Sequence, residues 1–220
     1  MGIALATPHQ SQNASADLIQ QTITEMIDNL LASLPAPKQL TSQDRRGIIA
    51  RYSAVLEGNF IYWMTATLIA VKAEDARPIL LENLHEEIRD AHPVMLRKFA
   101  LAAHAFPADM DVLAVNDEVN SMRRFLGKLS PVQSLLAMAF FEGYIQKFMP
   151  YLAELATLQG SKDMEYTDVH GVCDIAHTAG LFQAAAIEMT INPLEPEQDL
   201  YEGVTILRDL MQRIVFYSKN

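Results

Sequence analysis

The sequence predicts an all-α protein folded as a single helical bundle. Hydrophobic residues make up 50% of the 220 residues, whereas glycine occurs only 9 times. The 10 prolines lie mostly between segments whose apolar residues recur with helical spacing, and no segment shows the two-residue alternation of a strand. We therefore expect one bundle of about seven to eight helices over residues 15–220, preceded by a flexible tail over residues 1–14.

Capping residues and prolines predict the helices of the first half. The first helix covers about residues 16–33 and ends at Pro35-Ala36-Pro37. Thr41-Ser42-Gln43-Asp44 is a typical N-terminal cap and begins a long helix that extends to about residue 73. Three further helices are expected at about residues 75–90, 93–106 and 112–126.

Breaking residues also delimit the second half. Ser130-Pro131 places a proline in a first helical turn, and the apolar helix that follows extends to about residue 158, before Gly160-Ser161. The next helix covers about residues 166–189 and ends before Asn192-Pro193. The last helix is expected at about residues 198–217.

Charge and cysteine content exclude several classes of protein. The formal net charge is −10 and the isoelectric point is about 5.0, so we expect no nucleic-acid partner and no binding to an anionic membrane. No apolar run is long enough for a membrane span, and the start of the sequence lacks the features of a signal peptide. Cys173 is the only cysteine, which rules out an intramolecular disulfide. We expect a cytoplasmic protein that acts on a small molecule, and the sequence is compatible with a homodimer.

His170, Asp174 and His177 form the motif around which the chain is organised. On a helix they fall within a sector of roughly 60°, and the residues around them are largely apolar. A polar triad in apolar surroundings costs several kcal/mol unless it is satisfied. A divalent transition metal would satisfy all three side chains. The alternative is a His–Asp hydrogen bond together with an ordinary buried histidine.

Two glutamates interrupt otherwise apolar helical faces. Glu57 shares its face with Ala50, Ala54 and Ile61, and Glu142 lies in the uncharged helix that follows Pro131. A lone buried carboxylate is costly unless it is paired, protonated or bound to a metal. Each acid could instead lie at a helix edge and reach water.

A third acid is expected in the segment from Glu82 to Pro93. The helical angle favours Glu87 as the inward-facing acid, whereas Glu86 is calculated to point nearly the opposite way. His92 directly precedes a proline, so the helix should break there and the direction of His92 relative to Glu87 is not fixed. Four carboxylates and three histidines are too many for one metal, but suit a pair of iron or manganese ions in a helical bundle.

With these residues the sequence resembles the haem-oxygenase-like di-metal oxidases and oxygenases, which share the haem oxygenase bundle without binding haem. The resemblance extends from about Ser42 to Leu210. It rests on Glu57, the segment Asn83…Glu86-Glu87…His92-Pro93, Glu142 and His170-x-x-x-Asp174-x-x-His177. The spacer Ile88-Arg89-Asp90-Ala91 is shorter than in many members and lacks their glycine, so Glu86 and Glu87 both remain candidates for the second-helix ligand.

The resemblance implies two Fe(II) ions that activate O₂ as co-substrate. The implied metal ligands are Glu57, Glu87, His92, Glu142, His170, Asp174 and His177, and Glu57 and Glu142 are also the expected catalytic residues. Family members oxidise small carboxylates or amino-acid derivatives by N-oxygenation, C–C cleavage, decarboxylation or nitrile formation. Such a substrate needs a cation for its carboxylate. Arg51, Lys72 and Lys147 lie on the relevant helices, although the spacing of Arg51 and Lys147 favours ordinary surface positions for both.

Two alternatives belong to other functional classes. One is a metal-free enzyme of the same bundle, such as a thiaminase-type hydrolase, which needs an activated cysteine, or a cofactorless quinone-biosynthesis oxidase. The other is a non-enzymatic helical protein that stores metal or binds a partner.

Overall fold

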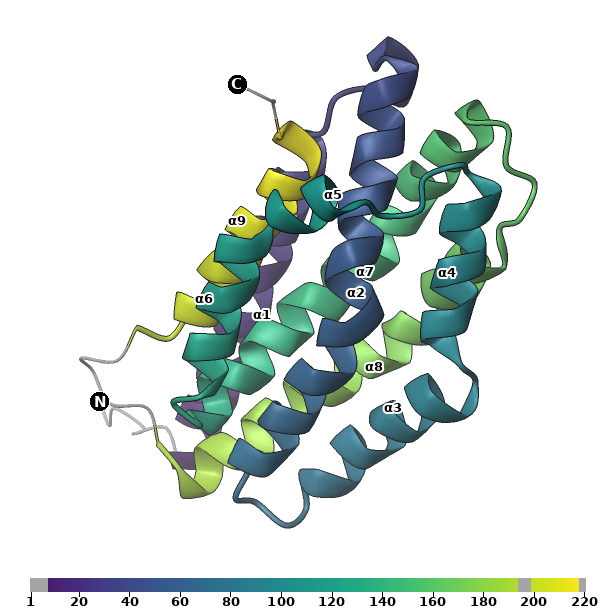
Figure 1. The fold of residues 1–220 in the computed structure, drawn as a ribbon. Coiled ribbons are helices and arrows are strands. Elements are labelled where there is room, and N and C mark those ends of the chain that lie inside the picture. The colour runs from purple at the N-terminus through teal and green to yellow at the C-terminus, as the bar shows by residue number, and fades with distance from the viewer. Residues whose placement is uncertain (1–7, 194–198, 218–220) are drawn as a thin grey trace.

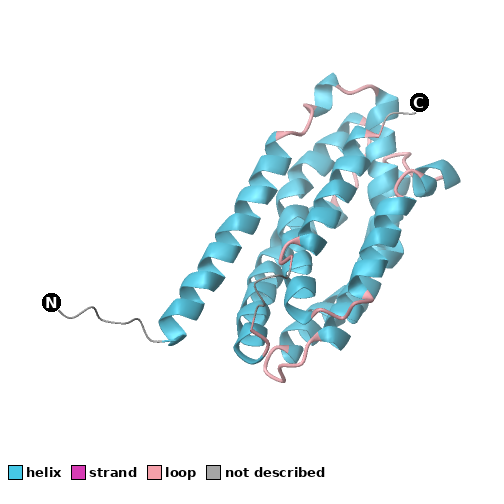
Figure 2. Ribbon diagram, turned by 90° about the vertical axis from the view of Figure 1, so that its left-hand side faces the viewer, coloured by secondary structure: helices cyan, strands magenta, loops and turns pink. Residues whose placement is uncertain are grey.

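A computed structural model describes residues 8–193 and 199–217, with side chains from residue 16 onward. Over this part of the chain the protein is an all-α bundle without strands, as predicted, and contains nine α-helices. Figure 1 shows the helices packed into one bundle, and Figure 2 shows that they are joined only by loops and short turns. The helices are α1 (Pro8–Ala32), α2 (Ser42–Ala70), α3 (Arg77–Arg89), α4 (His92–Ala102), α5 (Asp109–Leu113), α6 (Asn116–Leu126), α7 (Pro131–Leu158), α8 (Glu165–Ile191) and α9 (Glu202–Phe216), with a short 3₁₀ helix at Pro37–Gln39.

The apolar helix α7 forms the centre of the bundle. Every residue from Pro131 to Ile145 is buried, and α7 packs against α1, α2, α8 and α9. Its longest interface is with α8, which carries the His170 motif. Glu142 therefore lies in the middle of the core and faces the helix that supplies the histidines.

Local signals fixed several helix ends correctly. The predicted cap of α2 is a capping box, in which Thr41 accepts from the backbone N–H of Asp44 and the Asp44 carboxylate accepts from the backbone N–H of Thr41. Helix α7 begins at Pro131 as predicted, although the Ser130 side chain makes no capping hydrogen bond. Proline has no backbone N–H that needs an acceptor and its φ angle is already helical, which favours it at the first helical position.

Other boundaries differ from the predictions. Helix α1 begins at Pro8, within the segment expected as a tail, and residues 1–7 of that segment lie outside the described residues. The helix predicted over residues 112–126 is instead divided into α5 and α6. Asp111 of α5 pairs with Arg46 of α2 at 2.9 Å, which ties the short helix to the bundle.

None of the described helices is both long and apolar enough to cross a membrane.

Candidate metal centre

Side chains from α3, α4, α7 and α8 meet at a small buried cavity. Its polar wall consists of Glu87, His92, Glu142, His170 and Asp174, all of them buried. The cavity has a volume of about 20 Å³, which is room for roughly one water-sized or ion-sized occupant. Five of the seven predicted metal ligands thus border one small space.

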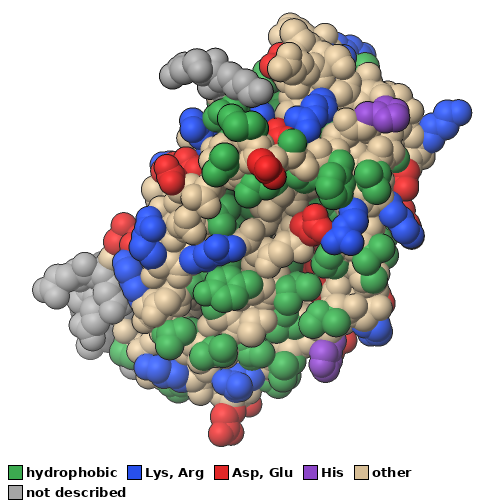
Figure 3. Space-filling model, viewed as in Figure 1, with side chains coloured by type: hydrophobic (Ala, Val, Ile, Leu, Met, Phe, Trp, Pro, Cys, Tyr) green, Lys and Arg blue, Asp and Glu red, His purple; other side chains and the backbone are tan. Residues whose placement is uncertain are grey.

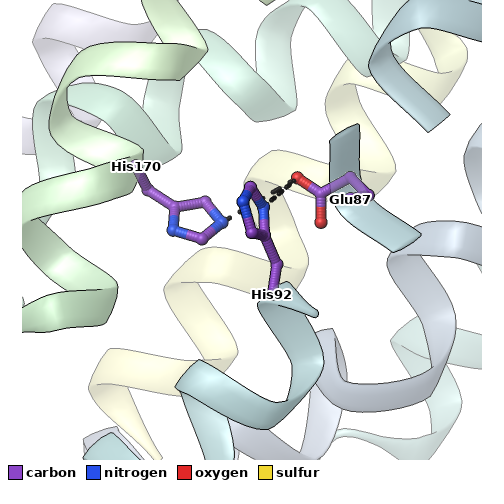
Figure 4. A group of neighbouring side chains, drawn as sticks. All are labelled: Glu87, His92 and His170. Atoms are coloured by element: carbon purple, nitrogen blue, oxygen red, sulfur yellow. Dashed lines mark hydrogen bonds and ion pairs between the residues drawn. The ribbon is translucent and has the colours of Figure 1, made fainter. Parts of the chain in front are cut away.

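Glu87, His92 and His170 form the first group of potential ligands. Glu87 Oε1 lies 2.8 Å from His92 Nδ1 and 3.9 Å from His170 Nε2. One ligand atom from each of the three lies within 4.8 Å of the others, the spacing expected around a single ion. Figure 4 shows the three side chains pointing toward one another from three different helices.

A backbone turn between α3 and α4 brings His92 to Glu87. Ala91 has a left-handed conformation with φ 56° and ψ 41°, and it ends one helix directly before the next begins. This conformation is costly for a residue with a Cβ atom, so the surrounding contacts must hold it. It determines the direction of His92, which the sequence alone left undetermined.

His170 is oriented by a bond to its own helix. Its Nδ1 lies 2.8 Å from the carbonyl oxygen of Tyr166. Since a carbonyl can only accept, Nδ1 is the nitrogen that donates in this bond. The other ring nitrogen, Nε2, faces Glu87. The Tyr166 hydroxyl is in turn 2.8 Å from the hydroxyl of Tyr52 on α2. Neither tyrosine was singled out from the sequence.

A second group surrounds His177. Its Nδ1 is 3.3 Å from Glu142 Oε2 and 3.6 Å from Asp174 Oδ1, and its Nε2 is 3.0 Å from Glu86 Oε2. Glu86 and Glu87 therefore take different places, since one lies at His177 and the other at His92 and His170. The long Glu86 side chain is 33% exposed and reaches His177 from the rim of the site.

Asn83 holds one oxygen of Glu142. Its side-chain amide donates to Glu142 Oε1 at 2.7 Å, and both residues are buried. Glu142 Oε2 and His177 Nδ1 are also buried, and they lie 3.3 Å apart without the geometry of a hydrogen bond between them or to any other group. Buried polar atoms left in this way are costly, and a cation between them would remove that cost. The hard carboxylate oxygens and imidazole nitrogens of the two groups fit iron or manganese.

The electrostatics of the site depend on its burial. Burial raises the pKa of Glu142 to about 7 against the opposing effects of His177 and Asn83. Burial alone would lower the pKa of His177, but the neighbouring Asp174, Glu142 and Glu86 carboxylates outweigh it and raise the pKa to about 11. For His92, the hydrogen bond and charge of Glu87 likewise outweigh burial, and its pKa is raised. The concentrated negative charge of these carboxylates favours any cation in the site.

Glu57 does not join either group. Its side chain is 28% exposed, and its Oε1 accepts hydrogen bonds from Arg97 of α4, at 2.9 Å from Nε and also from Nη2. Helix α2 is buried on several faces, so the apolar residues around Glu57 do not define one inward stripe. Leu56 and Phe60 line the cavity in its place. The structure thus brings together six of the seven predicted ligands and adds Glu86.

The three basic residues considered for binding a substrate carboxylate do not line the cavity. Arg51 donates to the carbonyl oxygen of Ile214 at 2.8 Å, and Lys147 pairs with Asp28 at 2.6 Å. The backbone N–H of Lys72 donates to Glu188 near the far end of α8. None of the three is among the residues that line the cavity.

Cys173 is poorly suited to act as a nucleophile. Its thiol donates to Asp174 Oδ1 at 3.2 Å, and burial together with the Asp174 charge raises its pKa. A catalytic cysteine needs the opposite, a thiolate stabilised by nearby positive charge.

One comparison with known proteins gives a match for most of the chain. A protein-family model described as an iron-containing redox enzyme matches residues 50–210. The matched stretch is well over half of the chain and includes every residue of both ligand groups. No curated protein sequence is a significant match to the chain.

Proposed function

The chain belongs to the haem-oxygenase-like family of iron-containing redox enzymes, and from this membership we propose a more specific function. We propose a non-haem di-iron enzyme that uses O₂ to oxidise a small carboxylate or an amino-acid-derived substrate. Iron and redox chemistry follow from the family, whereas the two irons and the use of O₂ are our proposal.

One observation carries the proposal: two groups of hard ligands lie side by side in the core. Within the described residues, no Lys or Arg forms an ion pair with Glu87, Glu142 or Asp174. Their cationic neighbours are His92 and His177, whose pKa values are raised, and a bound metal ion would displace those protons and take over the positive charge. The number of ligands favours two ions over one, since seven side chains exceed what a single iron can bind.

The two groups suggest how the residues divide between the ions. Glu87, His92 and His170 would hold one iron, and Glu86 and His177 would hold the other. Asp174 and Glu142 line the same cavity as the first group and also approach His177, so they are the carboxylates that both ions can share. Bound Fe(II) would supply the electrons that reduce O₂.

The protein's own residues prepare the site for that chemistry. The bond from His170 to the Tyr166 carbonyl directs Nε2 of the ring inward, and the bond from Asn83 leaves the second oxygen of Glu142 available. Leu56, Phe60 and Ile145 form apolar walls of the cavity. Such walls limit the access of water and reduce side reactions.

Anaerobic reconstitution with Fe(II) tests the proposal. The wild type should bind about two irons per chain and should develop a transient visible absorbance when O₂ is admitted. His170→Ala and Glu142→Ala should lose both properties because each removes a buried ligand. Glu154→Ala, a change of another glutamate on α7, is the matched control and should behave as the wild type. Binding of a single iron, or an unchanged response in Glu142→Ala, would contradict a dinuclear site.

A metal-storage protein is separated from an enzyme by its products. A store should take up iron without changing any organic molecule. The proposed enzyme should consume O₂ together with a small carboxylate, and mass spectrometry should show an oxidised product. Iron uptake with no product from any tested carboxylate or amino acid would favour storage.

A further inference from the structure

The apolar side of the cavity lies at the seam between α2 and α4. Leu56, Phe60 and Ile61 line it from α2, and Pro93 and Leu96 line it from α4. Glu57 directly follows Leu56, and Arg97 directly follows Leu96. The ion pair of Glu57 with Arg97 therefore joins the two helices on the outer side of this wall. Figure 3 shows the face that carries α2 and α4, where acidic and basic side chains neighbour each other among apolar ones.

Arg97 is paired with Glu57 in a solvent-exposed ion pair, which a competing carboxylate can replace. Its Nε and Nη2 both donate to the same oxygen, Oε1 of Glu57. A guanidinium can instead bind both oxygens of one carboxylate, which is the stronger geometry. The pair is also open to solvent, with side chains that are 51% and 28% exposed. Exposed ion pairs contribute little to stability, so breaking this pair costs little.

Other arginines of this region have different partners, among them Arg123, which donates to Asn59 of α2 at 2.8 Å. The described lining of the cavity contains no lysine or arginine. Arg51 is buried against the carbonyl of Ile214, far along α9, and Arg89 pairs with its neighbour Asp90. Arg97 is therefore the cation best placed to meet an anionic ligand that approaches the cavity through the seam.

We propose that Arg97 binds the carboxylate of the substrate at the mouth of the cavity, and that Glu57 occupies Arg97 while the site is empty. This inference rests on the proposed function, because it places the substrate of that same centre. The carboxylate stays at the outer end, and the apolar part of the molecule passes between Phe60 and Leu96 toward the histidines. A cavity of about 20 Å³ holds little more than one small group, so the wall side chains must move apart as the substrate binds.

Calorimetric binding to the anaerobic, Fe(II)-loaded protein tests the role of Arg97. The probes are benzoate, phenylacetate and hexanoate, each compared with its primary amide. Arg97→Gln should weaken binding of the best carboxylate by about tenfold or more, and Arg97→Lys should weaken it less. Glu57→Gln should tighten binding, because it removes the competing carboxylate. The amides should bind weakly to every variant. Arg208→Gln, which removes another exposed arginine paired with its neighbour, is the matched control and should bind as the wild type does.

Three results would overturn the proposal. The first is a carboxylate affinity that is equal in Arg97→Gln and the wild type, as expected if the carboxylate binds iron alone. The second is equal affinity for the amides. The third is a failure of all three carboxylates to bind Glu57→Gln with a Kd below about 10 mM.

Iron content and binding in the metal-free protein separate this proposal from the proposed function. If two irons bind but Arg97 has no effect, the inference fails and the di-iron proposal stands. If iron does not bind, yet the metal-free protein still binds carboxylates through Arg97, the di-iron proposal fails and the anion site stands.

Discussion

Glu142 and Glu57 look alike in the sequence, since each is a single acid within an apolar helical segment, but the structure gives them opposite surroundings. Glu142 is 1% exposed and lies against Asn83 and His177. Glu57 reaches the surface and is neutralised by Arg97. A carboxylate that already has a cationic partner in water has no need of a metal. At the residue scale, the partner of each acid separates a ligand candidate from a surface residue.

Substitution of Glu57 and Glu86 tests this difference directly. Glu86→Ala should lower the iron content below that of the wild type, because it removes a carboxylate 3.0 Å from His177. Glu57→Ala should leave the iron content unchanged. Metal analysis of the two purified variants after Fe(II) loading and desalting gives the comparison. Iron loss in Glu57→Ala with retention in Glu86→Ala would restore the assignment made from the sequence.

Asn83 should support the metal through Glu142. Asn83→Ala removes the donor to Glu142 Oε1, and loss of a group that orients a ligand typically lowers metal affinity by about 10- to 100-fold. Titration with Fe(II) under anaerobic conditions measures the change in affinity. Circular dichroism of the same samples shows whether the helices remain intact. Unchanged affinity in a folded variant would mean that Glu142 needs no such support.

At the scale of elements, α8 supplies three ligand candidates on one stripe, and the break between α3 and α4 supplies the rest of the first group. The spacing of His170, Asp174 and His177 fixes their relative directions within one helix. Between α3 and α4 the left-handed conformation of Ala91 sets the relative direction of two ligand candidates, since it turns His92 back toward Glu87. The arrangement of the candidate ligands therefore depends on both a regular helix and an irregular junction.

Gly203 tests how closely α9 packs against α6 and α7. A Cβ atom on Gly203 would lie 2.5 Å from Phe125 of α6 and 2.8 Å from the Ala137 side chain of α7. Gly203→Ala should therefore destabilise the protein by about 1–3 kcal/mol, because the buried neighbours must shift. Urea denaturation measures the free energy of unfolding.

Gly58 of α2 is the matched control for this prediction. A Cβ atom there meets nothing within 4 Å, so Gly58→Ala should stabilise the helix by up to about 1 kcal/mol. If both variants have the same stability as the wild type, α9 is not packed as closely as the structure places it.

At the scale of the whole molecule, the candidate metal centre takes its residues from four helices that are separate in the sequence. In the metal-free protein the buried carboxylates of α3, α7 and α8 repel one another. This repulsion opposes the packing of these helices and lowers the stability of the fold. A ligand that binds only the folded state stabilises it by mass action, by about 2.7 kcal/mol at a concentration 100 times its Kd. The fold and the candidate function are therefore coupled.

Removal of metal should consequently lower the melting temperature. The Tm of the wild type should rise with excess Mn²⁺, which is stable in air, and should fall when a chelator is added. His177→Ala should lose most of this shift, because it removes a candidate ligand that lies close to three carboxylates. Differential scanning fluorimetry provides the measurement. An equal Mn²⁺ response in both proteins would place the stabilising ion elsewhere.

Features that depend on local geometry could be predicted from the amino-acid sequence. Helical periodicity and proline placement gave the all-α class, and the Thr41 cap marked the start of α2. The stripe of His170, Asp174 and His177 followed from the helical repeat, and the isolated charge of Glu142 followed from its apolar surroundings. Each of these inferences needs only the residues within a few turns of one helix.

The rotation of each helix about its own axis, and hence which side chains meet between helices, could not be predicted in this way. Spacing fixes directions within α2 but not the face that it turns toward α4, so Glu57 could not be placed from its neighbours in sequence. The same limit applied to His92, whose direction depends on the left-handed Ala91, and to Glu86, which reaches His177 only because α3 passes beside α8. Such rotations are set by the packing of all the helices together, and packing energy is summed over contacts that no single segment contains.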